Sequence, residues 1–261
     1  MQERHTDYKL YFQESEISCL KYYLPYLKEY TSLSLGAGLK VLEVGCGLGG
    51  NLAPFARIGC EVSGVDIDSR SIDRAKELFQ GNGLHGTFTC GDIHDYKDTG
   101  RYQLIMLHDA IEHIHEKERL MFRLQELLAE DGILFIAFPA WRMPFGGHQQ
   151  VARTRFVSRC PFIHLLPKRT FAWLLRRLGE PEGAIRDFLD IRSTRMSIQG
   201  FQKLCRKMNL NIVNRRLYFI NPHYEVKFKL KPRQLWKGIA ALPYIRDFFC
   251  TSCHYLLTRR S

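Results

Sequence analysis

Short apolar runs alternate with amphipathic stretches along the first 140 residues. Consecutive apolar positions, typical of strands buried on both faces, occupy residues 40–44, 61–65, 86–90, 102–107 and 133–138. Between these runs the apolar positions recur with a helical period, which predicts helices over 51–58, 69–80 and 117–129. Asp131 and Gly132 mark a predicted turn before the fifth strand. Strands alternating with helices on short loops predict an α/β fold built on a parallel sheet.

This alternation breaks after residue 140. Residues 141–195 are basic and aromatic and contain four prolines, with one clear amphipathic helix over 168–178. The pattern then resumes with a predicted helix and two predicted strands over 197–208, 211–220 and 254–259. We interpret 141–195 as an insertion after the fifth strand, at the sheet edge where loops build specificity.

The predicted organisation is a core of residues 1–140 and 196–261, with 141–195 inserted as a substrate lid. The core begins with an amphipathic helix over 14–30. Pro25 lies inside this helix and lacks a backbone donor, so it predicts a kink or two short helices.

The two halves of the sequence carry opposite charge. Residues 1–140 hold 14 Lys/Arg and 21 Asp/Glu, a net of −7, and residues 141–261 hold 24 and 6, a net of +18; together they give the +11 of the chain. This asymmetry indicates an anionic partner for the second half, namely nucleic acid, a phospholipid surface or an acidic small substrate. A solvated basic face without a partner is the alternative.

The sequence predicts a cytoplasmic protein. No apolar run reaches the roughly 18 residues that span a bilayer, and the charged N-terminus lacks the apolar core of a signal peptide. Eight cysteines in 261 residues are few for a disulfide scaffold and indicate reduced thiols. Peripheral contact with an anionic membrane stays open, as does the oligomeric state.

The glycines after the first strand match two patterns. Gly45, Gly47 and Gly50 satisfy G-x-G-x-x-G, which is typical of dinucleotide-binding oxidoreductases, whereas Gly45, Gly47 and Gly49 satisfy G-x-G-x-G. Either turn lets backbone N–H groups approach a ligand closely. Asp66 ends the second strand, where a carboxylate accepts hydrogen bonds from ribose hydroxyls. It suits both kinds of ligand and does not discriminate between them.

Glu43 does discriminate between the two patterns. It lies inside an apolar strand two residues before Gly45, and a buried carboxylate is costly unless it is satisfied. A cofactor with a cationic amino-acid tail gives this carboxylate a partner, directly or through water. Asp92 and Ile93 close the third strand, where the carboxylate can accept from an adenine amine and Ile93 can pack on the ring. A simple turn also explains this pair.

Taken together, these motifs resemble the class I S-adenosylmethionine-dependent methyltransferases, in particular the ubiquinone/menaquinone-biosynthesis branch. The resemblance rests on Glu43-x-Gly45-x-Gly47-x-Gly49, Asp66, Gly91-Asp92-Ile93 and the stretch Leu107–Ile114 (LHDAIEHI). It covers residues 38–140 well and 197–220 with 254–260 loosely. It implies a Rossmann-like, seven-stranded, mostly parallel sheet with helices on both faces and an antiparallel last strand.

The resemblance also implies S-adenosylmethionine as cofactor and a role for each matching residue. The bend formed by Gly45, Cys46, Gly47 and Gly49 would pass under the methionine part. Asp66 would hold the ribose, with Ile67 beside the adenine. The adenine would also contact Asp92 and Ile93, and His108 would lie near the sulfonium.

The candidates for acid–base chemistry are three histidines, His108, His113 and His148, because imidazole titrates near neutrality. A second possibility is a divalent metal on Asp109, Glu112 and His113, since such an acidic-acidic-His pattern holds metal in some quinone-biosynthesis relatives. The favoured interpretation is no metal. Cys250 and Cys253 form a lone C-x-x-C without a second pair, which favours two thiols beside a strand over zinc.

The function predicted is methyl transfer to a small or amphiphilic acceptor, with O-methylation preferred. The basic, aromatic insertion suits a lid, a membrane-touching surface that takes a lipid-like acceptor, or a surface for single-stranded nucleic acid, the last being disfavoured. Apolar walls around the acceptor would favour a lipid or quinone-like molecule, and converging arginines a phosphate or carboxylate. The rival functions are an NAD-dependent oxidoreductase and a non-catalytic protein that binds an anionic partner through its basic half.

Overall fold

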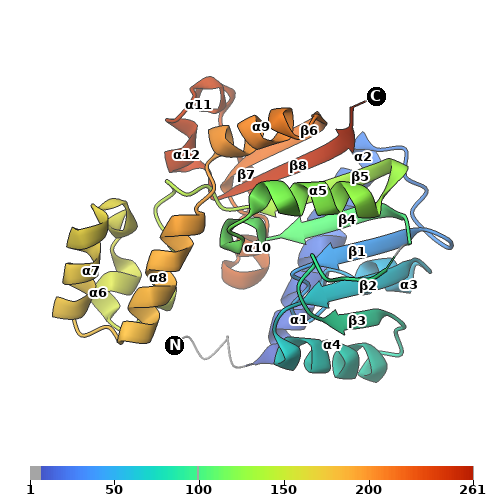
Figure 1. The fold of residues 1–261 in the computed structure, drawn as a ribbon, viewed down its shortest axis with the longest axis horizontal. Helices are drawn as coiled ribbons and strands as arrows, with labels where there is room; N and C mark the ends of the chain where they lie inside the picture. The colour runs from blue at the N-terminus through green and yellow to red at the C-terminus, as the bar shows by residue number, and fades with distance from the viewer. Residues whose placement is uncertain (1–6, 99, 261) are drawn as a thin grey trace.

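A single sheet organises the computed structural model, which describes residues 7–98 and 100–260. Its strands are β1 (Lys40–Val44), β2 (Glu61–Asp66), β3 (Thr87–Cys90), β4 (Tyr102–His108), β5 (Leu128–Phe138), β6 (Leu210–Ile220), β7 (Arg233–Gln234) and β8 (Ser252–Arg259). They are ordered β3-β2-β1-β4-β5-β8-β6-β7 (Figure 1). Strands β1 to β5 pair in parallel, and β8 is antiparallel to both β5 and β6. The predicted mostly parallel sheet with an antiparallel last strand is therefore confirmed.

The sheet has eight strands rather than the seven predicted. The additional strand is β7, which pairs antiparallel with β6 through Arg233 and Gln234. Two residues are too few to carry a period in the sequence, so this strand could not be predicted from the pattern. The carboxyl ends of β1, β2, β3 and β4 meet at one edge of the sheet because these strands run in parallel.

Helices cover both faces of the sheet. One face packs against α1 (Tyr8–Ser18), α2 (Leu24–Tyr30), α3 (Ala53–Arg57) and α4 (Ser69–Gly81), and the other against α5 (Lys117–Leu127) and α9 (Ile198–Lys207). Alternate strand residues serve the two faces, as the pleat requires: Leu104 and Met106 pack with the first group, and Ile105 and Leu107 with the second. Burial on both faces explains why β4 reads as a continuous apolar run.

A wider turn just before Pro25 divides the N-terminal helical region into α1 and α2, in agreement with the predicted alternative of two short helices. Residues Cys19–Tyr23 form a π-helical turn between α1 and α2, with the Leu24 N–H bonded to the Cys19 carbonyl. Pro25 then lies in the first turn of α2, where its missing donor costs no helical hydrogen bond. The extra residue in the π turn changes the direction of Tyr23, and such turns recur at functional sites.

The predicted turn at Asp131–Gly132 lies in an irregular stretch of β5. Pairing with β4 shifts there from Tyr102–Leu128 to Leu104–Ile133, so that β5 gains extra residues against β4. Gly132 is needed because an added Cβ would come within 2.8 Å of the Leu128 side chain. The preceding helix, predicted to reach residue 129, ends at Leu127 because Leu128 is already extended.

The insertion 141–195 has its own small core. It contains α6 (Arg155–Arg159), α7 (Lys168–Arg177) and α8 (Glu182–Thr194), which bury a separate cluster including Val157, Phe171 and Phe188. Figure 1 shows these helices beside the sheet rather than on either face. A hydrogen bond from the Trp141 N–H to the Met196 carbonyl, 2.8 Å long, joins the two ends of the insertion. Among the residues from 7 to 260 that are described, no helix combines the length and apolarity needed to cross a membrane.

Candidate functional site

The backbone bends sharply where β1 ends. Gly45, Gly47 and Gly49 have φ angles of 72°, 50° and 77°, in the left-handed region that favours glycine. The N–H groups of Gly45 and Cys46 both donate to the Val65 carbonyl, at 2.8 and 3.2 Å, which ties the bend to β2. A Cβ added at Gly47 would have no neighbouring atom within 4 Å. The bend therefore presents open backbone that a ligand can approach.

The third glycine of each sequence pattern is explained by packing. A Cβ at Gly49 would come within 2.9 Å of the Phe88 ring, and one at Gly50 would lie 2.5 Å from the Phe12 carbonyl oxygen. Gly50 thus lets α1 lie directly on the bend. The G-x-G-x-x-G match has this structural reason and needs no dinucleotide.

Glu43 is a buried carboxyl group with one unused oxygen. Its side chain is 1% exposed, and Oε1 accepts a 2.7 Å hydrogen bond from Asn51 Nδ2. Oε2 has no partner. Burial raises the pKa of Glu43 to about 8, and the Asp66 carboxylate adds to the effect. An unpartnered acceptor under an open glycine bend fits a ligand with a cationic group, which is the fit predicted for the methionine part of the cofactor.

Asp66 supports the bend from the end of β2. Its Oδ2 accepts from the Gly47 N–H at 2.8 Å, and its Oδ1 accepts from the Asp68 N–H at 2.9 Å. The next residue, Ile67, is 79% exposed, so its side chain is accessible to the adenine ring that the resemblance places beside it. Each carboxylate oxygen accepts more than one hydrogen bond, so these contacts leave capacity for ribose hydroxyls.

The predicted adenine contacts lie at the end of β3. Asp92 is exposed and accepts from the His94 N–H at 2.9 Å. Ile93 is 5% exposed and packs into the core beneath α5, so its side chain contributes mainly to that core. The structure brings these two residues to the same sheet edge as Asp66, and their adenine contacts stay a prediction.

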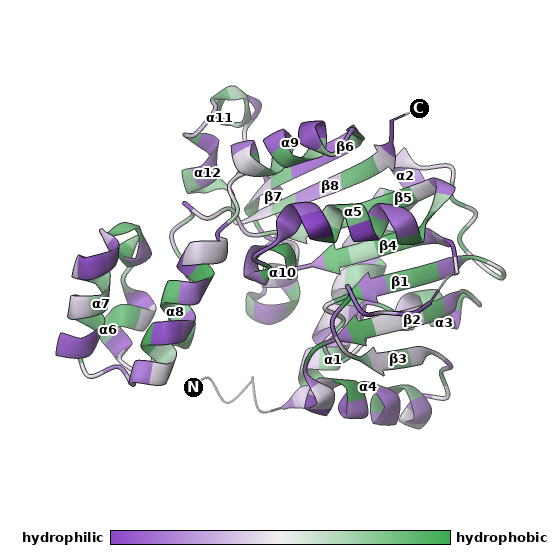
Figure 2. Cartoon of the chain, in the orientation of Figure 1, coloured by the Kyte–Doolittle hydropathy of each residue, from purple (hydrophilic) through white to green (hydrophobic). Residues whose placement is uncertain are grey.

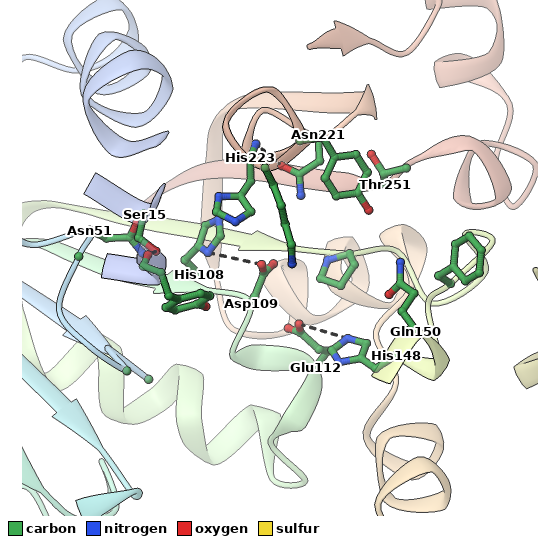
Figure 3. A pocket seen from close by; sticks show the side chains of 18 of the residues that line it. Ser15, Asn51, His108, Asp109, Glu112, His148, Gln150, Asn221, His223 and Thr251 are labelled. Carbon is green, nitrogen blue, oxygen red and sulfur yellow. Dashed lines mark hydrogen bonds and ion pairs between the residues drawn. The ribbon is translucent and has the colours of Figure 1, made fainter. Parts of the chain in front are cut away.

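A cavity of about 540 Å³ opens beside the bend (Figure 3). Of the predicted cofactor residues, Gly45, Cys46, Gly47 and His108 line it, whereas the acids of β2 and β3 lie outside it. The opposite wall comes from two regions that the sequence did not pair. The first is residues 143–151 at the start of the insertion, and the second is residues 221–228, which include α10 (His223–Phe228). Helices α6 to α8 contribute no lining residue, so only the first part of the predicted lid reaches this cavity.

His108 is held on both ring nitrogens at the end of β4. Nε2 lies 2.7 Å from the Tyr23 hydroxyl, and Nδ1 lies 3.5 Å from the Asp109 carboxylate. Because a carboxylate only accepts, the network assigns a proton to Nδ1 and makes Tyr23 the donor to Nε2. Burial, reinforced by Asp109, raises the pKa of Tyr23 well above its usual range. With a proton on Nδ1 and Nε2 accepting from Tyr23, His108 has no unused lone pair.

Asp109 adopts an uncommon backbone conformation beside this ring. Its φ is 51°, which non-glycine residues rarely adopt and which clusters at functional sites. Its N–H donates to the Ala137 carbonyl of β5 at 2.9 Å. The strained turn directs the carboxylate into the cavity, where Figure 3 shows it facing His108.

His223, absent from the sequence prediction, offers the lone pair that His108 lacks. The Ser18 hydroxyl lies 2.8 Å from the Glu14 carbonyl, to which it can only donate. The His223 Nδ1, 2.9 Å from the same hydroxyl, must then carry a proton and donate, which leaves the lone pair on Nε2. Burial lowers the pKa of His223 to about 4, with His108 as the next cause. The ring is thus neutral near pH 7, lines the cavity, and lies beside His108 in Figure 3.

Glu112, His113 and His148 gather on the other side of the cavity, and their ligand atoms all lie within 4.8 Å of one another. Glu112 Oε1 is 3.9 Å from His113 Nε2 and 4.0 Å from His148 Nε2. Both oxygens of this buried carboxyl lack hydrogen bonds, and burial raises its pKa well above the usual range. The donor set suits a divalent cation. His148 takes the place that the alternative metal pattern had given to Asp109, and a metal stays the alternative that the sequence did not favour.

Cys250 and Cys253 are buried free thiols at the start of β8, with their sulfur atoms 3.5 Å apart. Among the residues that the structure describes, the one cluster with metal-ligand geometry does not include them. The prediction of two thiols beside a strand agrees with this arrangement.

Comparison with known proteins agrees with the geometry. A family profile described as a methyltransferase domain matches residues 19–179, more than half of the chain. The ubiquinone biosynthesis O-methyltransferase of Rhodopseudomonas palustris (strain BisB5) is 30% identical over 106 residues, which are 41% of this chain and 42% of that protein. The enzyme of the same name from Bartonella bacilliformis is 27% identical over 128 residues, 47% of this chain and 52% of its own. The chain thus spans about half the length of these curated relatives, or less.

Solved structures of low identity share the fold. An S-adenosylmethionine-dependent methyltransferase from Clostridium acetobutylicum superposes with a TM-score of 0.57 at 13% identity, covering 98% of this chain and 93% of its own. The geranyl diphosphate C-methyltransferase of Streptomyces coelicolor gives a TM-score of 0.56 at 14% identity, covering 90% and 77%. Together with the profile match and the glycine bend, this fold shows that the chain belongs to the methyltransferase-domain family, as a class I S-adenosylmethionine-dependent member.

Proposed function

We propose that this protein transfers a methyl group from S-adenosylmethionine to a hydroxyl of a small or amphiphilic acceptor. The observation that carries the proposal is one cavity with two unlike ends. The glycine bend with Glu43 behind it forms one end, and a wall of histidine, asparagine and acidic side chains forms the other. A cavity of this kind brings a donor and an acceptor together, which is what methyl transfer needs.

The lining supports an aromatic or quinone-like acceptor. Apolar and aromatic side chains contribute much of the surface, namely Tyr11, Tyr23, Met143, Phe145, Val151, Tyr224 and Phe228. Among the described residues that line the cavity there is no arginine, so it lacks the fork that recognises phosphate or carboxylate. The curated relatives named above are O-methyltransferases of ubiquinone biosynthesis, and a phenolic hydroxyl is the acceptor group that best suits both facts.

The protein's part in the reaction is alignment, exclusion of water and proton removal. The bound cofactor supplies an electrophilic methyl group, so no covalent intermediate with the chain is required. Glu43, the Gly45–Gly49 bend and Asp66 would hold the cofactor at the sheet edge. A hydroxyl becomes a good nucleophile when a base takes its proton, and the Nε2 of neutral His223 is an imidazole acceptor at the cavity that its hydrogen bonds leave free. His108 has both ring nitrogens engaged, and it would hold the Tyr23 hydroxyl and the Asp109 carboxylate in place at the cavity wall.

Binding of S-adenosylhomocysteine is expected to release close to one proton per site at pH 7. The Glu43 carboxyl, with a pKa of about 8, is mostly protonated in the free protein, and a cationic amino group beside it favours the ionised form. Affinity should rise roughly tenfold from pH 6 to pH 7 by linkage. Calorimetry in buffers of different ionisation enthalpy measures the released proton.

The free protein should also lose stability as the pH rises from about 4.5 to 8. Over this range the folded chain keeps a proton on Glu43 that the unfolded chain releases.

Glu43→Gln should bind without proton release and with little dependence on pH. Glu61→Gln, at an exposed carboxyl of β2, is the matched control and should behave as the wild type. Unchanged proton release in Glu43→Gln would show that another group interacts with the amino-acid tail.

The function itself is tested by turnover with a labelled methyl donor and a panel of acceptors. The panel includes a catechol, the same catechol with a prenyl tail, a phosphorylated alcohol and an amine. Label should appear on the phenolic oxygen of the first two, more efficiently with the tail. Methylation of carbon or nitrogen would overturn O-methylation. An absence of turnover together with nicotinamide dinucleotide binding would favour the oxidoreductase alternative.

A further inference from the structure

The segment from the end of α10 to the start of β8 exposes large apolar side chains within a basic stretch. Six of them are between 47% and 74% exposed, namely Phe228, Leu230, Trp236, Leu242, Tyr244 and Ile245. Residues 227–249 also contain six Lys/Arg and a single acidic residue, Asp247. Figure 2 shows hydrophobic and hydrophilic residues interleaved along α11 (Lys237–Ala241) and α12 (Arg246–Phe249). Exposed aromatic groups and cations on one short segment are unusual for a solvated surface.

Buried contacts hold this segment against the sheet. Leu235 is 7% exposed. Arg246, also 7% exposed, donates from Nη2 to Gln202 Oε1 at 2.9 Å. Asp247 is fully buried and accepts from Arg142 Nη1 at 3.0 Å. Because the only acid of the segment is buried and paired, the charge that this surface presents to solvent is entirely positive.

The same surface adjoins the cavity. Lys227 and Phe228 line the cavity at one end of the segment, and Thr251 lines it at the other. Phe248 contacts Phe162 of the insertion, with ring centroids 6.2 Å apart. A molecule lying on the surface would therefore be next to the cavity that we assign to the acceptor.

We propose that residues 228–249 dock on an anionic phospholipid bilayer and bring the cavity to the membrane interface. Aromatic and aliphatic side chains enter the headgroup region while Lys and Arg meet anionic lipid, which is the physics of interfacial binding. Tryptophan and tyrosine favour that depth in particular, and Trp236 and Tyr244 are the two most exposed members. Docking itself does not rest on methyl transfer, whereas delivery of a lipid-like acceptor rests on the proposed function.

Trp236 provides the first test. It is 74% exposed, Trp173 on α7 is 60% exposed, and the third tryptophan, Trp141, is buried at 8%. In Trp173→Phe, vesicles of phosphatidylglycerol and brominated phosphatidylcholine should quench the tryptophan emission and shift it to shorter wavelength. In Trp236→Phe, which keeps Trp173, the emission should change little. Vesicles of phosphatidylcholine alone should bind weakly, and added salt should reduce binding to the anionic vesicles.

Charge reversal on the docking surface provides the second test. Lys231→Glu with Lys237→Glu should weaken co-sedimentation with the anionic vesicles at least tenfold. The matched control, Arg70→Glu with Lys76→Glu on α4, makes the same change of charge at exposed positions near the other edge of the sheet. All four positions are exposed, so thermal unfolding and S-adenosylhomocysteine binding should stay as in the wild type. This separates failure of docking from failure of the cofactor site.

Several outcomes would overturn the proposal. One is equal loss of vesicle binding in the docking and control variants. Another is quenching of Trp173 instead of Trp236, which would move the membrane contact to the insertion. A third is salt-sensitive binding of a single-stranded oligonucleotide with no quenching by vesicles, which would make nucleic acid the partner of the basic half.

Discussion

Replacement of Asp66 by alanine is expected to lower the affinity for S-adenosylhomocysteine about 100-fold. The Asp66 carboxylate accepts from the Gly47 and Asp68 N–H groups and would also accept from the ribose. Hydrogen bonds to a charged group are each worth roughly 1.5–3 kcal/mol. Losing two of them at the cofactor corresponds, at the lower end of that range, to about 100-fold in the dissociation constant. Titration calorimetry measures the change directly.

A second substitution at this position separates the loss of cofactor contacts from the loss of support for the glycine bend. Asp66→Asn keeps an oxygen that can accept from the Gly47 N–H and should lose less affinity than Asp66→Ala. Asp73→Ala removes an exposed carboxylate from α4 and should bind as the wild type. Undiminished binding by Asp66→Ala would remove the second strand from the cofactor site and would count heavily against our assignment of the bend.

The second large effect is expected at His223. His223→Gln should lower kcat about 100-fold with a phenolic acceptor, the lower end of what a positioned base contributes. The cofactor affinity should not change, because the ring lies on the acceptor side of the cavity. The loss should shrink as the acceptor hydroxyl becomes more acidic, since an ionised phenol needs no base. A purely structural role for His223 would affect all acceptors alike.

The pH dependence follows from the lowered pKa of His223. The lone pair on Nε2 is available while the ring is neutral, so activity is lost as the pH falls through about 4 rather than near 6.5. For the same reason the folded protein should lose stability between about pH 6.5 and 4, where the unfolded chain binds a proton that the buried ring does not. His223→Gln should remove that part of both profiles.

Two further variants complete this test. Ser18→Ala removes the hydroxyl that orients His223 Nδ1 and should lower kcat less than loss of the ring itself. His85→Gln changes an exposed histidine next to β3 and should have no effect. Full activity in His223→Gln with weakly acidic phenols would return the base to His113 or His148.

Much of the cofactor half follows from local sequence. Residues 40–66 contain the strand β1, the left-handed glycines after it and the acid at the end of β2. Each of these features is recognisable from the local sequence. A left-handed bend needs glycine, a strand buried on both faces needs an apolar run, and Glu43 stands out as an acid within such a run. The carboxyl ends of parallel neighbours must share an edge, so Asp66 and Asp92 were predictable as well.

The acceptor half does not follow from local sequence. Ser18 and His223 are 205 positions apart, and Tyr23 and His108 are 85 apart, yet each pair is in hydrogen-bond contact. Tyr23 reads as one more apolar position of a helix, whereas in the structure it ends the π turn with its hydroxyl 2.7 Å from His108 Nε2. His223 lies between the predicted strands 211–220 and 254–259, in a stretch with no motif of its own.

The sequence alone determined the α/β class, the mostly parallel sheet with an antiparallel last strand that the methyltransferase resemblance implied, and the glycine bend with an acid at the end of the neighbouring strand. These depend on residues close together in the chain, where backbone geometry and hydrophobic period act directly. Tertiary structure decided that His223 rather than His108 keeps a free lone pair, which part of the insertion reaches the cavity, and that exposed aromatic side chains adjoin its mouth. Such properties depend on burial and on contacts between distant segments, which only packing of the whole chain creates.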